Sequence, residues 1–481
     1  MIKDFLDKDE VGKYVAAMRE QAATKGLDKQ KMEAAAQAIG GRASQPVEAV
    51  LAALPTDNTG EASSGEATVK SPFFSRNPAV SLLQTSLEDE ARAVDPPIVH
   101  EPKTGGLFPH IAGAIEALRH EAEHIGHTIE TVLDPEKFST TDSEWVTRVA
   151  DATLDRLAKG NRPFNHVPAE YAITEANARI VIVGDWGSGL PRAQAVARLM
   201  AGEIEEATAQ GRTVHVIHLG DVYYSGDPVE VQRRVLADGM WPVTVAQAQA
   251  GVKSWALNGN HDMYSGGWGF FDTLLTDPRF KNQSSPDGNP TSFFRIRTPT
   301  WDLIGLDTSW DLEVLSLGKS GVLADPQASV VAVWADEAER AEPKRKVMLL
   351  SHHQFVSCYD HTDIGTVLPH KLAPLLERRE IDAWIWGHEH RCVGLESEMG
   401  APPDPPFMRC IGHGGIPVPA IAAGTAPPKP GIWQTEGSFH ENDDDWAKFG
   451  FAVLDFDEHA GLTIRYRDDE GDEDHPPEAI G

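Results

Sequence analysis

Short apolar runs that stop abruptly at polar residues, in most cases after a glycine, recur from residue 180 onward. The clearest is residues 214–219, which carries four branched apolar side chains, ends at Gly220 and Asp221, and is followed by Tyr224. Such a run predicts a buried strand. A carboxylate at the carboxyl end of a strand lies where open α/β sheets bind ligands. We therefore expect Asp221 to take part in chemistry rather than in packing.

Four further runs end in the same way, each in residues that bind metals or transfer protons. Because open α/β sheets place their ligands outside the carboxyl ends of the strands, we expect the five ends to meet at one edge of a sheet. The runs are 180–183 before GDWG at 184–187, 255–257 before the GNHD at 259–262, 347–350 before SHH at 351–353, and 381–386 before GHEH at 387–390.

Helical and strand patterns alternate around these runs. Pro191 favours the first turn of a helix, here one that reaches about residue 210 and returns the chain to the strand before Asp221. Residues 293–297 and 301–306 are predicted to be adjacent strands, and 451–456 with 462–466 a late pair. The alternation predicts a layered α/β sandwich.

The N-terminal third has a different organisation. Apolar residues at alternating spacings of three and four from Phe108 to Val132 predict one long helix, which would pack on the catalytic domain or on a second copy of the chain. The expected parts are a small helical unit at 1–55, a partly irregular linker at 56–100, a helical segment at 101–165, the catalytic domain at 176–470 and a solvated acidic tail at 471–481. Within the catalytic domain, the proline-rich stretch 391–449 is expected to be irregular, and it either borders the substrate cleft or is structural filler.

Composition narrows the classes of function. The formal net charge of −30 disfavours nucleic acid as a partner, because nucleic-acid binders gain most of their affinity from a basic surface. No apolar run approaches the ~20 residues of a membrane span, and the first residues lack the pattern of a signal peptide. With three sparse cysteines, expected to be reduced thiols, the sequence favours a soluble cytoplasmic protein that acts on neither membranes nor nucleic acid.

The ordered motifs GDxG, GDxxY, GNHD, a strand-end histidine and GHxH resemble those of the calcineurin-like metallophosphoesterase superfamily, whose fold is an α/β/β/α sandwich. The GDxG and GDxxY forms resemble the purple acid phosphatase branch. The resemblance covers residues 180–467. It implies two metal ions bridged by Asp221, the first held also by Asp185, Tyr224 and His390, and the second by Asn260, His352 and His388.

The implied ligands also make chemical sense. Oxygen and imidazole donors without thiolate suit iron, manganese or zinc. In the plainer form of the first motif, DxH, a histidine follows the aspartate by two residues, and this chain has Gly187 at that position. The resemblance therefore assigns the missing ligand to Tyr224. A phenolate favours Fe(III), with Fe(II), Mn(II) or Zn(II) beside it.

The expected activity is hydrolysis of a small phosphomonoester or a nucleotide-like phosphodiester by attack of a metal-bound hydroxide. His261 is the candidate general acid or leaving-group stabiliser, with Asp262 orienting it. His353, Arg391 and Tyr223 are candidate substrate contacts. Two alternatives remain: a nuclease of the same superfamily, and an assembly or regulatory protein that acts through its helical N-terminus.

Overall fold

The chain divides into two units, Met1–Ala158 and Lys159–Gly481. The computed structural model describes residues 159–312, 321–358, 367–397, 404–416, 425–434, 447–457 and 461–480, with Ala152, Arg156 and Val418. The helical unit predicted at 1–55, the linker at 56–100 and nearly all of the helical segment at 101–165 therefore lie outside the described residues.

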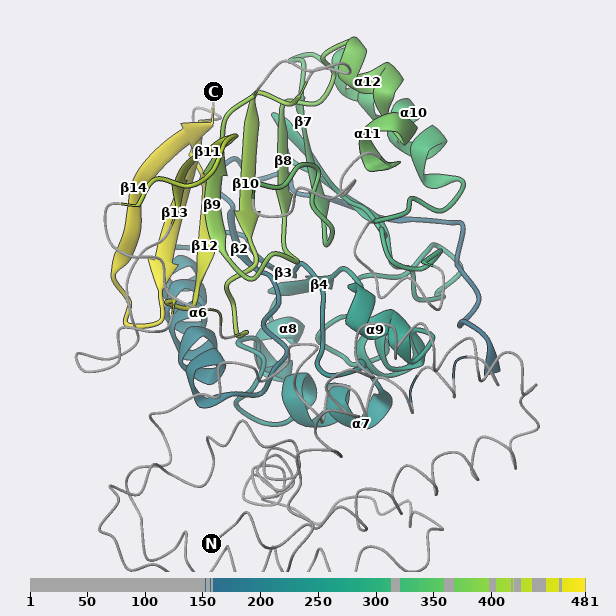
Figure 1. The fold of residues 1–481 in the computed structure, drawn as a ribbon, viewed down its shortest axis with the longest axis vertical. Coiled ribbons are helices and arrows are strands. Elements are labelled where there is room, and N and C mark those ends of the chain that lie inside the picture. The colour runs from purple at the N-terminus through teal and green to yellow at the C-terminus, as the bar shows by residue number, and fades with distance from the viewer. Residues whose placement is uncertain are drawn as a thin grey trace, which may run out of the picture. The chain divides into compact units, whose positions relative to one another are not determined.

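Two β-sheets form the centre of the second unit (Figure 1). The six-stranded sheet has the order β14-β13-β12-β2-β3-β4, and the eight-stranded sheet the order β1-β5-β6-β7-β8-β10-β9-β11. The strands are β1 (Ala169–Ala172), β2 (Arg179–Val183), β3 (Val214–His218), β4 (Lys253–Ala256), β5 (Phe294–Arg297), β6 (Trp301–Gly305), β7 (Lys346–Ser351), β8 (Ala383–Trp386), β9 (Cys392–Leu395), β10 (Phe407–Ile411), β11 (Gly431–Gln434), β12 (Gly450–Phe456), β13 (Leu462–Asp468) and β14 (Glu473–Ile480).

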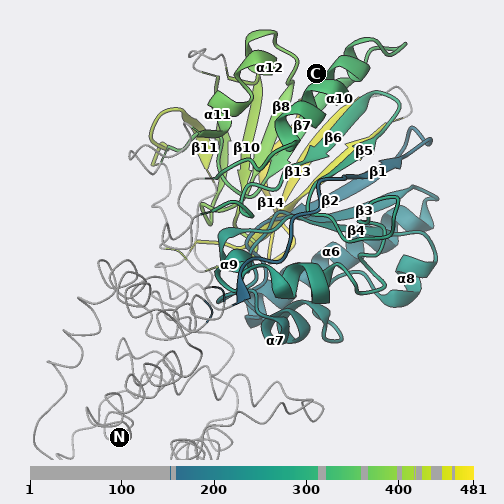
Figure 2. The same cartoon turned by 90° about the vertical axis from the view of Figure 1, so that its right-hand side faces the viewer.

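Helices cover the outer face of each sheet (Figure 2). On α6, Val196, Met200 and Ile204 are fully buried at a spacing of four, which is the apolar stripe of a surface helix, and α6 packs against β2, β3 and β12. The helices are α6 (Pro191–Ala209), α7 (Pro228–Val231), α8 (Val245–Gln249), α9 (Asn260–Tyr264), α10 (Gln327–Glu339), α11 (Val367–Lys371) and α12 (Ala373–Glu377), with π-helical turns η3 (Gln232–Leu236) and η4 (Phe270–Leu274). None of the helices in the described part of the chain has the length and apolarity to cross a membrane.

The main core lies between the two sheets. Ile180 and Ile217 from the six-stranded sheet join Met348 and Ile385 from the eight-stranded sheet in one fully buried cluster. A second core packs the other face of the eight-stranded sheet against α10, α11 and α12. Strands covered on both faces are mostly apolar, which explains the nearly continuous apolar runs in the sequence. The predicted α/β/β/α sandwich is confirmed.

The structure differs from the prediction in three places. The five motif-bearing strand ends come from two sheets, since β2, β3 and β4 belong to one and β7 and β8 to the other. The stretch 391–449, expected to be irregular, contributes β9, β10 and β11. The acidic end forms β14, which pairs antiparallel with β13, and Glu478 on it forms an ion pair with Arg409 at 2.6 Å. Charge compensation therefore lets an acidic segment complete a sheet.

Candidate metal centre

The backbone turns sharply at four of the predicted ligand positions. Asp185, Asp221, His388 and His390 have φ angles of 54°, 74°, 68° and 52°, and among the described non-glycine residues only Arg379 shares this left-handed conformation. Such a conformation costs about 1–3 kcal/mol per residue and concentrates at functional sites. Each residue follows β2, β3 or β8, so the turn at each strand end directs its side chain into one region between the sheets.

One group of side chains gathers around Asp185. Its Oδ1 lies 3.5 Å from Nε2 of His390 and 3.1 Å from the hydroxyl oxygen of Tyr223. The same hydroxyl lies 3.0 Å from Oδ2 of Asp221 and 2.9 Å from Nε2 of His390. The other oxygen of Asp185 accepts a hydrogen bond of 2.7 Å from the amide of His388. Asp185 and Tyr223 are fully buried.

A second group gathers around His352. Its Nε2 lies 3.0 Å from Oδ1 of Asn260, 3.1 Å from Nδ1 of His388 and 3.5 Å from Oδ2 of Asp221. Oδ2 of Asp221 is therefore common to both groups, as expected of a bridging carboxylate. The structure brings together six of the seven predicted ligands: Asp185, Asp221, Asn260, His352, His388 and His390.

The hydrogen bonds show that the second group fits a cation. Nδ1 of His352 lies 3.0 Å from the carbonyl oxygen of Leu219, which only accepts, so Nδ1 carries the proton. Burial, reinforced by the neighbouring His353 and His388, lowers the pKa of His352 well below its ordinary value and keeps the ring neutral. The amide nitrogen of Asn260 donates to the hydroxyl of Tyr264 at 2.9 Å, so its oxygen faces Nε2. The amide oxygen of Asn260 and Nε2 of His352, 3.0 Å apart, are an oxygen and an imidazole donor of the kind that a divalent cation takes.

The carboxylates Asp185 and Asp221 also indicate that the site holds a cation. Burial and the charge of Asp221 raise the pKa of Asp185 well above its ordinary value, and burial raises the pKa of Asp221. Buried carboxylates at this proximity keep protons unless positive charge replaces them. A metal ion supplies that charge.

Tyr224, the ligand predicted from the GDxxY spacing, makes other contacts. Its amide donates to Glu230 at 2.6 Å, its carbonyl oxygen lies 2.6 Å from Nδ1 of His261, and its ring lies 5.2 Å from the guanidinium of Arg234. Among the described residues, the phenol that lies beside Asp185, Asp221 and His390 is that of Tyr223. The structure thus differs from the motif-based assignment, because the loop after β3 directs the first of the two tyrosines inward.

His261 lies at the edge of the two groups. Its Nδ1 must carry a proton, because it faces the carbonyl of Tyr224, and its Nε2 lies 4.0 Å from Oδ2 of Asp221. Burial lowers the pKa of His261. Asp262 does not orient this ring as expected. Its Oδ2 accepts from the amides of Gly259 at 2.8 Å and Asp221 at 3.0 Å, so it holds the loop backbone in place.

The end of β6 contributes residues that the sequence reasoning missed. Oγ1 of Thr308 lies 2.9 Å from Nδ1 of His353, and Ser309 donates to the carbonyl of Asn258 at 3.0 Å. His353 in turn packs its ring 4.7 Å from that of His388. Residues 307–309 follow the predicted strand 301–306 as the other motifs follow theirs, although that strand contains Asp302.

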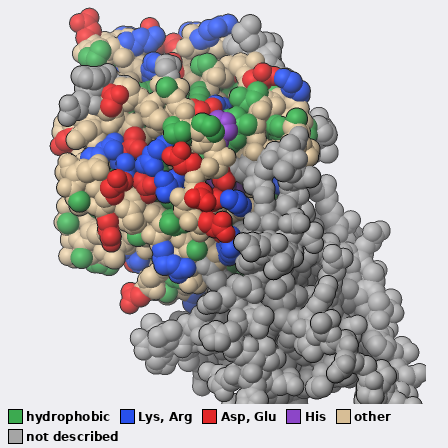
Figure 3. Space-filling view, turned by 90° about the vertical axis from the view of Figure 1, so that its left-hand side faces the viewer, with side chains coloured by type: hydrophobic (Ala, Val, Ile, Leu, Met, Phe, Trp, Pro, Cys, Tyr) green, Lys and Arg blue, Asp and Glu red, His purple; other side chains and the backbone are tan. Residues whose placement is uncertain are grey.

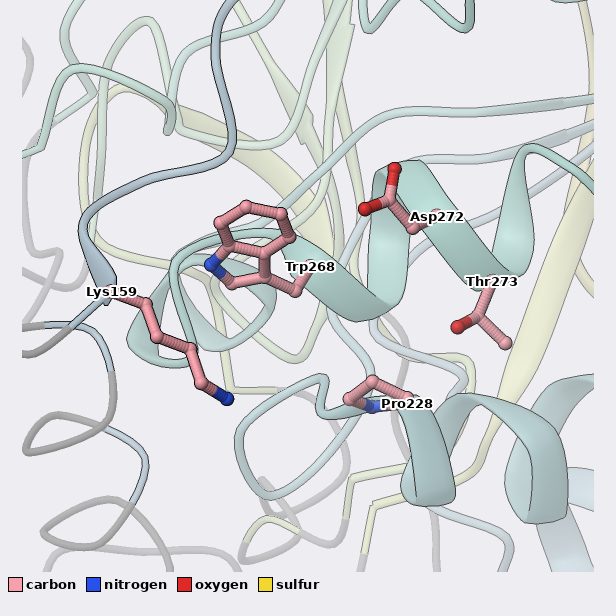
Figure 4. A pocket seen from close by; sticks show the side chains of 5 residues that line it. All are labelled: Lys159, Pro228, Trp268, Asp272 and Thr273. Carbon is pink, nitrogen blue, oxygen red and sulfur yellow. The ribbon is translucent and has the colours of Figure 1, made fainter.

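Arg391, predicted to contact substrate, directly follows His390. Its carbonyl accepts from the amide of Gly412 at 2.9 Å. Burial lowers the pKa of His390 well below its ordinary value, and the charge of Arg391 adds to this effect. A pocket of about 520 Å³ opens beside the loops that follow the Asp221 and His261 motifs (Figure 4). It contains none of the predicted site residues; its lining is Lys159, Pro228, Trp268, Asp272 and Thr273.

Two groups of candidate metal ligands thus lie together on a layered pair of sheets. Residues 178–392 match the family model described as calcineurin-like phosphoesterase. No significant match was found among curated proteins.

Similar solved structures include GAP50 of Plasmodium, described as the anchor in the inner membrane complex, at 13% identity over 64% of this chain and 89% of that one, with a TM-score of 0.43. A purple acid phosphatase from yellow lupin seeds matches at 14% identity over 65% of this chain and 55% of its own, with a TM-score of 0.45. A dimetal phosphatase from Danio rerio matches at 14% identity over 64% and 99%, with a TM-score of 0.40.

Proposed function

We propose that this protein is a dinuclear metal-dependent phosphoesterase that hydrolyses a small phosphomonoester or a nucleotide-like phosphodiester. One observation carries the proposal: acceptor atoms of Asn260 and His352 face each other at 3.0 Å, beside a carboxylate, Asp221, that also borders the group around Asp185. Two cations sharing Asp221 account for this arrangement. The same segment matches the calcineurin-like phosphoesterase family.

The donor set suits Fe(III) in the first position and Fe(II), Mn(II) or Zn(II) in the second. Such ions supply a water of lowered pKa and neutralise the phosphate oxygens. The chain supplies the rest. Asp221 sets the spacing of the two positions, and the left-handed turns at Asp185 and His390 hold their side chains inward.

His261 is suited to proton transfer at one defined atom. Since the carbonyl of Tyr224 holds Nδ1 at 2.6 Å, Nε2 is the atom that gains or releases a proton, and it lies on the side of Asp221. A proton on Nε2 would neutralise the charge on a departing ester oxygen. His353, whose Nδ1 is held by Thr308 at 2.9 Å, is the nearest further imidazole and a candidate phosphate contact.

Charge favours a small substrate over a nucleic acid. The net charge of −30 repels polyanions. Figure 3 shows acidic and basic side chains interleaved on one face of the described residues, with no continuous basic surface there. Ion pairs among the described residues, such as Arg179 with Glu206 at 2.7 Å, compensate part of the basic charge. These features support hydrolysis of a small ester over a nuclease activity. An assembly role for the N-terminal third would be compatible with the same centre.

The proposal is tested by metal analysis of the purified protein together with a panel of phosphomonoesters, phosphodiesters and DNA. We expect about two metal ions per chain and turnover of small esters that is lost on chelation and restored by metal. Fewer than one bound ion after reconstitution, or metal-independent turnover, would overturn it. Preferential cleavage of DNA would instead support the nuclease.

A further inference from the structure

We infer that Tyr223, and not Tyr224, supplies the phenolic oxygen to the first metal position, so that the two adjacent tyrosines have separate tasks. The inference rests on the proposed function, since it concerns the same centre. It departs from the GDxxY spacing, which selects Tyr224. Both side chains are fully buried, so burial alone does not distinguish them, and the contacts of each must decide.

The surroundings of the Tyr223 hydroxyl are those of a metal ligand. Its oxygen lies 3.1 Å from Asp185, 3.0 Å from Asp221 and 2.9 Å from Nε2 of His390. A phenol has one hydrogen and can donate to only one of these three atoms. Two buried carboxylates and an imidazole therefore converge on an oxygen that cannot satisfy them all. A cation shared by the phenolate, Asp185, Asp221 and His390 satisfies the whole set.

Two buried charged residues fix the orientation of this loop. Arg234 donates to the carbonyl oxygen of Tyr223 at 2.5 Å, and its guanidinium lies 5.2 Å from the ring of Tyr224. Glu230 accepts from the amides of Tyr224 at 2.6 Å and Ser225 at 2.8 Å. These contacts come from α7 and η3, on the outer side of the loop. They hold the Tyr224 ring beside Arg234 while the Tyr223 ring faces inward.

The task of Tyr224 is then performed by its backbone. Its carbonyl oxygen lies 2.6 Å from Nδ1 of His261 and determines which ring nitrogen faces the centre. A substitution that keeps the backbone leaves this contact intact. Tyr223→Phe and Tyr224→Phe are therefore a matched pair: each removes one buried hydroxyl from the same loop, and only the first removes an oxygen from the metal centre.

The experiment compares both variants with the parent protein after reconstitution with iron, by metal content, visible absorption and resonance Raman of the tyrosinate. We expect Tyr223→Phe to lose the charge-transfer band and the tyrosinate vibrations and Tyr224→Phe to keep both. Loss in Tyr224→Phe with retention in Tyr223→Phe would overturn the inference and leave the phosphoesterase intact.

A second measurement decides the case in which the parent protein binds no iron. Titration of the metal-free proteins with Zn(II) should show affinity at one site weakened at least about 10-fold in Tyr223→Phe, the lower end of what even an indirect partner of a metal contributes. Tyr224→Phe should bind both ions as the parent does. Equal affinities in Tyr223→Phe and the parent would overturn the inference, whereas absence of zinc binding in the parent would overturn the proposed function itself.

Discussion

Replacing Gly259 by alanine should displace the carboxylate that the two metal positions share. Gly259 has φ −100° and ψ −176°, an extended conformation open to any residue, so the substitution strains no backbone angle. Its Cβ, however, would lie 1.9 Å from Oδ1 and 2.6 Å from Cγ of Asp221. Reaching an ordinary contact of 3.4 Å requires a shift of about 1.5 Å, whereas metal–ligand distances tolerate about 0.2 Å.

The same shift breaks the hydrogen bond of 3.0 Å from the amide of His261 to Oδ1 of Asp221. A hydrogen bond between neutral groups contributes about 0.5–1.5 kcal/mol, so Gly259→Ala should lower the free energy of unfolding of the metal-free protein by at least that much. With metal, it should bind fewer than one ion where the parent binds about two. Denaturant unfolding and elemental analysis measure the two effects.

Gly202→Ala is the matched control. Gly202 lies within α6, and a Cβ there would meet nothing within 4 Å. Alanine inside a helix is favoured over glycine by about 0.5–1 kcal/mol, so this variant should be as stable as the parent or slightly more stable, with full metal content. If Gly259→Ala also retained two ions and the stability of the parent, Gly259 would not restrict the position of the Asp221 side chain. The assignment of Asp221 as the ligand shared by both metal positions would then be wrong.

Three further predictions concern the same loops. His261→Ala should keep both metals but lose about 10²–10⁴ in turnover of esters with poor leaving groups, and much less with p-nitrophenyl phosphate; equal losses would show that it is not the acid. Asp262→Ala leaves the amides of Gly259 and Asp221 without their acceptor and should lower the free energy of unfolding by about 2–6 kcal/mol, measured with denaturant. Asp262→Asn should lower it less. An Asp262→Ala variant as stable as the parent would contradict the role of Asp262 in holding the loop. Burial raises the pKa of Asp185 and Asp221 in the metal-free protein, so these carboxyls must lose protons to bind a cation. The rise in Tm on adding metal should therefore be larger at about pH 7.5 than at about pH 5. Equal rises at the two pH values would count against the ligand assignment.

Much of this centre was predictable because the strands that carry it are buried on both faces. β2 and β3 have every residue buried, so their apolar runs, and the polar residues that end them, are visible without an alignment. The run before residues 307–309 contains Asp302, and its polar end is aspartate, threonine and serine. Those residue types indicate turns as readily as support for a histidine.

Other features depend on specific side-chain contacts that the hydrophobic pattern does not report. The choice between Tyr223 and Tyr224 depends on Arg234 and Glu230, which lie beyond the motif and act on the loop from its outer side. β14 forms from an acidic segment because Arg409, far along the chain on β10, compensates Glu478. Neither pairing has a local signature, since periodicity reports which residues are buried and not which segments meet.

The position of β12 bears on how the chain folds. β12 lies between β13 and β2, with Ala452 paired to Ile182, so a strand near the end of the chain completes the ladder of the strand that precedes Asp185. Until it is added, β2 has an open edge of the kind that associates with other chains. Pairings so distant in sequence form slowly. We therefore expect the carboxylates of the centre to be fixed in place late, after the C-terminal hairpin has docked, and chains interrupted before β12 to aggregate rather than bind metal.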